Sequence, residues 1–299
     1  MSLLVVGSIA LDTIETPAGK AETILGGSAV YFTAAAQHYS RVRLVGVVGE
    51  DFPQDCRAFL GGMNADLAGL AVRPGETFRW HGRYQGAMNE AETIRVDLNV
   101  FGTFEPSLPA VFRDSDYVFL ANGAPELQMK VLEQVEGPRL AVADTMNLWI
   151  ANRREALDEL LDRVDALCLN ENEARMLTGE QVLARAARAL VKRGLKSVII
   201  KRGEHGVTVA SKQSICALPA FPEENVVDPT GAGDSFAGAM MGFLAETGRT
   251  DPATMLRAAA HGSAVASFTV QGFGPQHVAA LSREKIEKRV AELKAICTF

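Results

Sequence analysis

Short apolar runs and segments with helical spacing follow one another along most of the 299-residue chain. The run Leu3–Ile9 is almost wholly apolar, which is typical of a strand buried on both faces of a sheet. Similar runs predict strands at Arg43–Val48, Tyr117–Ala121, Leu140–Ala143, Ala166–Leu169 and Ser197–Ile200. Apolar residues at helical spacing predict helices at about Ala29–Tyr39, Pro125–Val135, Arg153–Leu161, Glu171–Leu177, Val182–Arg193, Ala258–Thr269 and Arg283–Ala295. This alternation favours a mainly parallel sheet with helices on both faces.

Three segments in the first half of the chain have a different pattern. Thr77–Arg83 and Glu92–Val100 alternate partly between apolar and polar residues, as half-exposed strands do, and Gly86–Asn89 is the predicted turn between them. Thr13–Leu25 is polar and predicts a hairpin or a loop. We expect these segments to form a small sheet that stands off the main domain.

Composition narrows the class of protein. The formal net charge of −6 argues against a nucleic-acid-binding protein, because phosphate-backbone binding is usually accompanied by a basic surplus. No apolar run reaches membrane-spanning length, and Met1–Ala10 lacks the basic start and long apolar region of a signal peptide. The four cysteines are scattered and predict neither a metal site nor a disulfide framework. These features predict a cytoplasmic protein with one large α/β domain, or two smaller ones, and no membrane or nucleic-acid partner.

A glycine-rich turn opens an apolar helix within the stretch Asn225–Ala245. The first amides of a helix have no internal partner and its N-terminus is partly positive, so this turn can bind an anion on its N–H groups. We infer that the amides of Gly231, Ala232 and Gly233 stabilise a transferred phosphoryl group. Asp234, in the first helical turn, would accept the proton of the attacking hydroxyl. The alternative is that Asp234 is an ordinary first-turn acid, favoured by the helix dipole.

Other candidate residues lie where predicted strands end and helices begin. Asp12 follows the first strand, and ligands of open α/β sheets bind beyond the carboxyl ends of strands, so this carboxylate can hold sugar hydroxyls. The alternative for Asp12 is a turn cap. Gly26 and Gly27 precede a helix for which Ser28 is the expected N-cap; they are either a substrate-facing pair or a simple turn.

The sequence Asn170-Glu171-Asn172-Glu173 forms an oxygen-rich cluster at a strand-to-helix junction. Two amides and two carboxylates suit magnesium, bound through water. The alternative is a helix N-terminus with ordinary first-turn acids.

The segment DPTGAGDSFAGA, residues 228–239, resembles the C-terminal signature of the PfkB/ribokinase family of carbohydrate and nucleoside kinases. The resemblance extends, in order, over nearly the whole chain. It implies a ribokinase-like three-layer αβα sandwich, with residues 1–299 as a single domain and lid segments at about 13–24 and 76–101. It also implies ATP-dependent phosphorylation of a hydroxymethyl group of a small sugar, sugar acid or nucleoside, with Mg²⁺ as cofactor and Asp234 as general base. In some members of the family two lids pair into a homodimer.

The resemblance gives roles to residues on the acceptor and magnesium sides of the site. Asp12 would hold the acceptor hydroxyls, with the pair Gly26 and Gly27 against the substrate. Asn99, at the end of a predicted strand, is either a substrate contact or a strand-end cap. The family has an Asn-x-x-Glu motif that acts on magnesium and phosphate, and Asn170 and Glu173 match it.

On the nucleotide side, the strand end that lines the nucleotide in the family corresponds here to Lys201, Gly203 and Gly206. A surface cation at a hairpin is the alternative for Lys201. His261 falls near a position that is often Asn in the family, so it is either an adenine neighbour or a packed, hydrogen-bonded histidine. Asp228 and Thr230 resemble the family's monovalent-cation site, which predicts potassium as a further cofactor.

Departures from the ribokinase pattern bear on the acceptor. Ala10, Ser28 and Tyr31 stand where ribokinase usually has Asn, Lys and Asn, which argues against ribose. Tyr31 and Phe32 make the pocket more apolar, so an adenosine-like nucleoside kinase stays the alternative to a sugar kinase. A NAD(P)-dependent enzyme is disfavoured because the third glycine of its motif would fall at Phe236. A non-catalytic sugar-binding module has no use for a base in an anion site.

Overall fold

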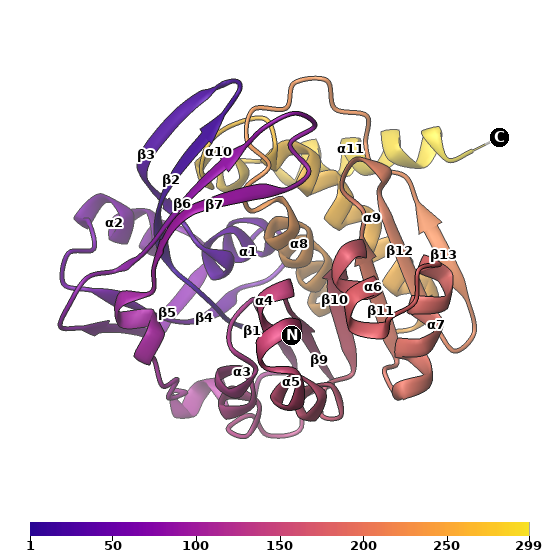
Figure 1. The fold of residues 1–299 in the computed structure, drawn as a ribbon, viewed down its shortest axis with the longest axis horizontal. Helices are drawn as coiled ribbons and strands as arrows, with labels where there is room; N and C mark the ends of the chain where they lie inside the picture. The colour runs from indigo at the N-terminus through magenta and orange to yellow at the C-terminus, as the bar shows by residue number, and fades with distance from the viewer. Residues whose placement is uncertain (299) are drawn as a thin grey trace.

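The computed structural model describes residues 1–298, which are organised around a nine-stranded sheet (Figure 1). From edge to edge its order is β13 (Ile215–Leu218), β12 (Val207–Ser211), β11 (Ser197–Lys201), β10 (Ala166–Asn170), β9 (Leu140–Asp144), β8 (Tyr117–Leu120), β1 (Leu3–Val6), β4 (Val42–Gly49) and β5 (Ala65–Arg73). The strands from β5 to β11 are parallel, whereas β12 and β13 form an antiparallel edge. The predicted, mainly parallel sheet is confirmed.

Strand β1 shows why the central strands form where they do. All of Leu3–Val6 is fully buried. Leu3 and Val5 belong to the core on one face of the sheet, and Leu4 and Val6 belong to the core on the other. Alternate side chains of a strand point to opposite faces, so a run that is apolar at every position requires cover on both sides.

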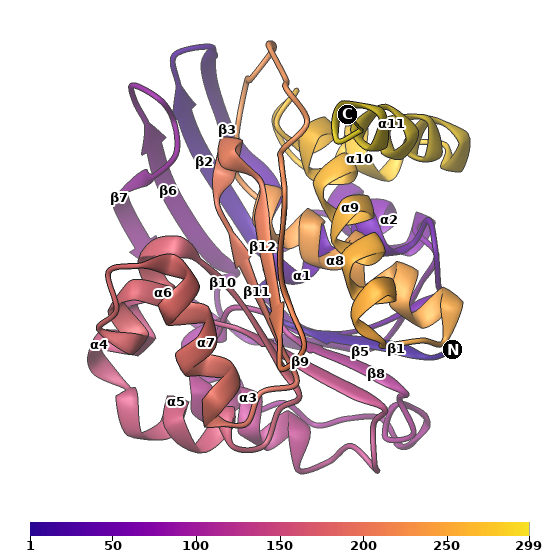
Figure 2. The same cartoon turned by 90° about the vertical axis from the view of Figure 1, so that its right-hand side faces the viewer.

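Two layers of helices provide that cover (Figure 2). One core contains residues of α1 (Ser28–Ala36), α8 (Ala232–Thr247), α9 (Pro252–Thr269), α10 (Gln276–Ala279) and α11 (Arg283–Ile296). The other contains residues of α3 (Pro125–Leu132), α4 (Asn147–Asn152), α5 (Arg154–Leu161), α6 (Glu171–Thr178) and α7 (Leu183–Arg193). Helix α8 is buried on all sides from Ser235 to Ala245. None of the helices within residues 1–298 is long and apolar enough to cross a membrane.

A second sheet of four strands stands away from the main sheet (Figure 2). Its order is β3 (Gly19–Gly26), β2 (Ala10–Thr16), β6 (Phe78–Tyr84) and β7 (Ala91–Asp97). Strands β2 and β6 are parallel, and the two outer pairs are antiparallel. The predicted small sheet is therefore present. It begins at Ala10, so Asp12 belongs to this sheet and does not simply follow β1.

Some local predictions were wrong. Gly27 is the N-cap of α1, and Ser28 is its first residue; the Ser28 hydroxyl accepts a hydrogen bond from the backbone N–H of Ser8 at 3.1 Å instead of capping the helix. Strand β7 ends before Asn99. Asn99 has a φ of 48° and is the first residue of a short 3₁₀ helix (Asn99–Thr103). Strands β5, β12 and β13 and helices α2 (Gln54–Gly62), α4 and α10 had no specific prediction. β5 and β13 are edge strands with mostly half-exposed side chains, so they lack a continuous apolar run.

Candidate active site

Helix α8 begins at the glycine-rich turn, and the conformation of this turn requires glycine. Gly231 is the N-cap of α8 and has a φ of 73°, in the left-handed region. A Cβ at this position would lie 2.3 Å from the Tyr31 ring of α1. Backbone conformation and packing therefore both exclude a side chain, and the turn is held directly against Tyr31.

The backbone amides of this turn divide into two groups. The Ala232 N–H donates to the Pro229 carbonyl at 3.1 Å, so this predicted anion donor is already used within the protein. The N–H groups of Gly231, Gly233 and Asp234 donate to no other group within residues 1–298. Free N–H groups at a helix N-terminus provide a site for an anion.

Asp234 lies in the first turn of α8, beside these free amides. Its side chain keeps part of its surface open to solvent. Burial of the rest raises the pKa of Asp234 to about 7; the negative charge of Asp144 adds to the shift, and the positive charge of Lys201 opposes it. A carboxylate with a pKa near neutrality is suited to accepting a proton from a hydroxyl at physiological pH.

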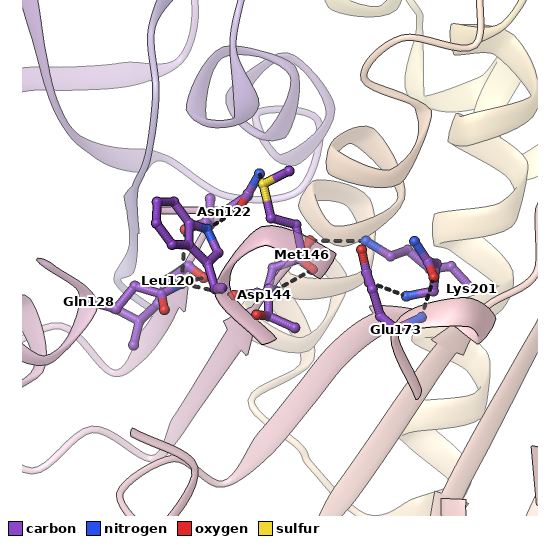
Figure 3. A network of polar contacts seen from close by, with 11 residues as sticks. Leu120, Asn122, Gln128, Asp144, Met146, Glu173 and Lys201 are labelled. Atoms are coloured by element: carbon purple, nitrogen blue, oxygen red, sulfur yellow. Dashed lines mark hydrogen bonds and ion pairs between the residues drawn. The ribbon is translucent and has the colours of Figure 1, made fainter. Parts of the chain in front are cut away.

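A lysine and a second acid lie beside the same turn. The Nζ atom of Lys201, at the end of β11, lies 2.9 Å from Oδ2 of Asp144, at the end of β9, and Figure 3 shows the two side chains pointing toward each other. A Cβ built on Gly233 would lie 3.2 Å from this Nζ, so the ammonium is next to the start of α8. Burial opposes the charge of Lys201, but Asp144 and neighbouring groups outweigh it and raise the pKa of Lys201 above its ordinary value.

Asn170 and Glu173 hold each other at the start of α6. The Asn170 side chain accepts a hydrogen bond from the Glu173 N–H at 2.8 Å, and Glu173 Oε2 accepts one from the Asn170 N–H at 2.6 Å. This capping box is the local alternative that the sequence left open. Burial raises the pKa of Glu173 to about 7; Lys201 opposes this shift and Asp144 adds to it. The carboxylate is therefore near the Lys201–Asp144 pair, where a role toward magnesium stays a prediction.

Asp12 brings the small sheet into the same site. A Cβ on Gly26 would lie 1.8 Å from Oδ2 of Asp12, so the predicted glycine pair does lie against this carboxylate. Oδ1 of Asp12 is buried without a hydrogen-bond partner. Burial raises the pKa of Asp12 to about 8; the charge of Asp228 adds to the shift, a hydrogen bond from Gly27 opposes it, and Asp234 adds further. Three acids thus share one region.

The candidate cation site lies just before α8. Asp228 is fully buried, and its Oδ1 accepts a hydrogen bond from the Thr230 N–H at 2.8 Å. Its Oδ2 is buried without a partner, and burial raises the pKa of Asp228. An orphaned carboxylate oxygen fits a cation, so potassium at Asp228 and Thr230 stays a prediction.

The small sheet makes side-chain contacts with both sides of this region. The Thr230 hydroxyl donates to Tyr84 Oη of β6 at 3.2 Å. In the turn after β6, Asn89 donates to Glu204 at 3.3 Å, beside the β11–β12 turn that contains Gly203 and Gly206. Glu90, in the same turn, accepts a hydrogen bond from Asn172 of α6 at 2.5 Å. The sheet therefore spans from the start of α8 to the start of α6.

One face of the small sheet combines acidic and apolar side chains. Asp12, Trp80 and Val96 pair in register across β2, β6 and β7, and residues paired in register share a face. Asp12 identifies this face as the one turned toward the site. Val96 is 50% exposed, so an apolar side chain stands uncovered there. A hollow of about 280 Å³ also lies against this sheet, and its lining includes Trp80 together with the charged residues Arg79, Arg95 and Asp97. Pairing of two such sheets into a dimer stays a prediction.

Two predicted residues make contacts within the protein that account for them in another way. Asn99 donates its side-chain N–H to the Thr77 carbonyl at 3.0 Å. His261 is buried in α9, with Nδ1 3.1 Å from the Tyr39 hydroxyl and its ring stacked on Phe243 at 4.1 Å. Phe243 is about 13 Å along α8 from Asp234, at 1.5 Å per residue. His261 thus has the packed, hydrogen-bonded surroundings that the sequence offered as its alternative, and a place beside adenine stays a prediction.

The sequence interpretation missed Asp144. Its only signal was its place directly after the predicted apolar strand Leu140–Ala143, at the carboxyl ends of the strands, where ligands of α/β sheets bind. Nothing in the sequence linked it to Lys201, which is 57 residues away. The link depends on β9 and β11 being second neighbours in the sheet.

Helices cover both faces of the parallel sheet, and an acid, free amides and a lysine lie together at the start of α8. The family match and the relatives given next show that the chain is a phosphotransferase that acts on an alcohol. The model of the pfkB family carbohydrate kinases matches residues 2–281. The chain belongs to the pfkB family of carbohydrate kinases.

Individual relatives agree with this assignment. The cytidine kinase of Thermococcus kodakarensis is 36% identical over 259 residues, which cover 84% of this chain and 90% of that protein. The structure of a nucleoside kinase from Methanocaldococcus jannaschii superposes with a TM-score of 0.80 at 21% identity, covering 98% of this chain and 99% of that one. A putative ribokinase II from E. coli, in complex with ATP and Mg²⁺, also has a TM-score of 0.80, at 20% identity, with 97% and 99% covered. The two structures show that the fold is shared.

Proposed function

We propose that the chain transfers the terminal phosphoryl group of ATP to the hydroxymethyl group of a nucleoside, with cytidine as the first candidate. The observation that carries this proposal is the start of α8, where the Asp234 carboxylate, free backbone amides and the Lys201 ammonium lie together. The 36% identity with a cytidine kinase over 84% of this chain supports the acceptor class.

In the proposed reaction Asp234 accepts the proton of the acceptor hydroxyl. The hydroxyl oxygen forms a bond to the terminal phosphorus, and the bond from that phosphorus to the oxygen of the departing ADP breaks. The N–H groups of Gly231 and Gly233, with the Lys201 ammonium, stabilise the negative charge of the group in transfer. Because phosphoryl transfer depends mainly on positioning and electrostatics, these few groups suffice to define the step.

The residues beside Lys201 fit a magnesium ion. Glu173 is a buried carboxylate whose Oε1 accepts no hydrogen bond within residues 1–298, and Asn170 adds an amide oxygen next to it. Oxygen ligands, with water completing the shell, are what Mg²⁺ prefers. Asn170 and Glu173 would hold the ion, which neutralises phosphate charge when bound.

The small sheet suits a nucleoside as acceptor. The unpaired Oδ1 of Asp12 would be satisfied by a sugar hydroxyl, since a buried polar atom without a partner costs about 1–3 kcal/mol. Trp80 and Val96 on the same face offer apolar surface to a nucleobase, which a free sugar would leave uncovered. The sheet would then act as a lid that excludes water from the transfer step.

The test is a screen for ADP release with ATP and Mg²⁺ over nucleosides, deoxynucleosides, free sugars and sugar acids. We expect kcat/KM for at least one nucleoside to exceed that for every free sugar by about tenfold or more. Phosphorus NMR of the product should place the new phosphate on the hydroxymethyl oxygen. A free sugar with the highest kcat/KM would contradict the nucleoside assignment. The variant Asp234→Asn is the control for contaminating kinases, because it should release little ADP with any acceptor.

A further inference from the structure

We propose that Asp144 is a positioning residue of the phosphoryl-transfer site, holding the Lys201 ammonium beside the first turn of α8, where it meets the group in transfer. This inference rests on the proposed kinase function and extends it to a residue that no motif in the sequence identified. Asp144 would not contact the acceptor or the nucleotide itself; it would act through Lys201.

Both carboxylate oxygens of Asp144 are already engaged. Oδ2 accepts a hydrogen bond from Lys201 Nζ at 2.9 Å, and Oδ1 accepts one from the Thr145 N–H at 2.9 Å. The carboxylate of Asp234, in contrast, accepts no hydrogen bond within residues 1–298. Asp144 is thus placed to hold a cation, whereas Asp234 is free to accept a proton.

The position of Asp144 is fixed by a buried glutamine (Figure 3). The side-chain amide of Gln128 donates to the carbonyl oxygens of Leu120, Ala121 and Asp144 at distances of 2.9, 3.0 and 2.9 Å. Gln128 is 1% exposed and Asp144 is 3% exposed. One side chain therefore ties the carboxyl ends of β8 and β9 together, which gives the Asp144 carboxylate a rigid base.

A contribution to folding stability does not by itself explain the ion pair between Lys201 and Asp144. Lys201 lies on β11 and Asp144 on β9, so the lysine side chain crosses β10 to reach its partner. Removing two charges from water offsets most or all of the attraction between them, so a buried ion pair gives little net stability. Its place at the carboxyl edge of the sheet, with Nζ close to Gly233, points instead to a role at the anion site.

Asp144 also determines which acid the lysine contacts. Lys201 lies within the electrostatic range of Glu173 and Asp234 as well as Asp144. Without the Asp144 charge, the ammonium is left with these two acids as partners. Pairing with Asp234 would occupy the base, and pairing with Glu173 would draw the cation away from Gly233. Either outcome lowers the rate of transfer more than it lowers nucleotide affinity.

A double-mutant cycle tests whether Asp144 acts through Lys201. With the acceptor that wild type uses best, Lys201→Met should lower kcat by about 100-fold, as loss of a positioned charge donor does. Asp144→Asn should lower kcat by about 10-fold and change KM for ATP by less than about threefold, because the contact is made in the transition state. The double variant should match Lys201→Met alone. A loss of about 1,000-fold, the product of the two single effects, would mean that the residues act independently and would overturn the proposal.

A binding measurement gives a readout that does not depend on turnover. Thermal shifts are measured with ADP–Mg²⁺, and again with fluoroaluminate added as a mimic of the phosphoryl group in transfer. Wild type and both single variants should be stabilised equally by ADP–Mg²⁺, whereas the further shift from fluoroaluminate should be reduced in Asp144→Asn and lost in Lys201→Met. Equal fluoroaluminate shifts in all three proteins would overturn the proposal. If wild type phosphorylates no acceptor yet shows the fluoroaluminate pattern, the proposed acceptor fails while the role of Asp144 stands.

The chain offers a matched control at the amino ends of the strands, away from the carboxyl ends where Asp144 lies. Asp165 precedes β10, pairs with Lys196 at 2.6 Å, and also accepts a hydrogen bond from the Ala141 N–H at 2.8 Å. Asp165→Asn should lower the melting temperature without changing kcat or the fluoroaluminate shift. If Asp144→Asn resembles this control, with lower stability and normal kcat, then Asp144 is only structural and the proposal is wrong.

Discussion

Replacing Asp234 by Asn should make the protein both slower and more stable. Asn has nearly the same shape but cannot accept the proton of the acceptor hydroxyl. Loss of a general base lowers kcat by roughly 100-fold or more. ATP affinity should change little, because the free amides of Gly231 and Gly233 are retained.

The gain in stability follows from the pKa of Asp234. Folding raises this pKa from an ordinary 3.8 to about 7, chiefly through burial. The folded state therefore binds a proton more tightly than the unfolded state, so stability falls as the pH rises from about 4 to 7. A shift of about three pKa units corresponds to about 4 kcal/mol, and the partial solvent contact of the side chain reduces this to about 1–2 kcal/mol. Asp234→Asn lacks that penalty at pH 8 and should have no such advantage near pH 4.

The assay combines urea unfolding at pH 4 and pH 8 with turnover at saturating acceptor. The matched control is Glu284→Gln, because Glu284 is also a first-turn acid, at the start of α11. The control should lose about 0.3–1 kcal/mol through the helix dipole and keep its kcat. If Asp234→Asn behaves like the control, slightly less stable and still active, then Asp234 is an ordinary helix-start acid and the mechanism is wrong.

Three further predictions concern the rest of the site. Because Asp234 has a pKa near 7, kcat/KM should fall about tenfold for each pH unit below 7; a flat profile between pH 5 and 7 would exclude it as the base. Asp12→Asn should lower kcat/KM for the acceptor by about 100-fold through a higher acceptor KM, with KM for ATP within about threefold of wild type, as initial-rate kinetics would show. Replacing potassium by choline should lower kcat about tenfold if a cation contacts the free Oδ2 of Asp228, and equal rates in the two salts would remove potassium from the site.

The sequence predicted the central part of the fold better than its edges. A central parallel strand is buried on both faces, so Leu3–Val6 is apolar at every position and is recognisable without other information. An edge strand has a neighbouring strand on one side only, and the side chains of the edge strands β5 and β13 are mostly half-exposed. The burial of Ala65–Arg73 and Ile215–Leu218 alternates irregularly, and no local pattern distinguishes them from loops.

In the site, the features formed by consecutive residues could be predicted, whereas those formed by residues far apart in the sequence could not. Gly231–Asp234 form a turn and the first turn of a helix, so the chemistry of consecutive residues was enough to predict them. The pair of Lys201 and Asp144 exists only because the sheet order brings two strand ends together. His261 was left with two alternatives because the sequence shows that α9 is a helix of small residues but not which of its sides meets α8.

Strand β2 links the movement of the small sheet to the position of Asp12. The same strand carries Asp12 and lies in the interior of the small sheet whose turn reaches Glu204 and whose Tyr84 meets Thr230. Any swing of that sheet away from the main domain would therefore carry Asp12, the proposed partner of the acceptor hydroxyls, with it. If Asp12 holds the acceptor as proposed, uncovering the pocket and loosening the grip on the phosphorylated product would be one motion, and we expect no open state that still holds the product tightly.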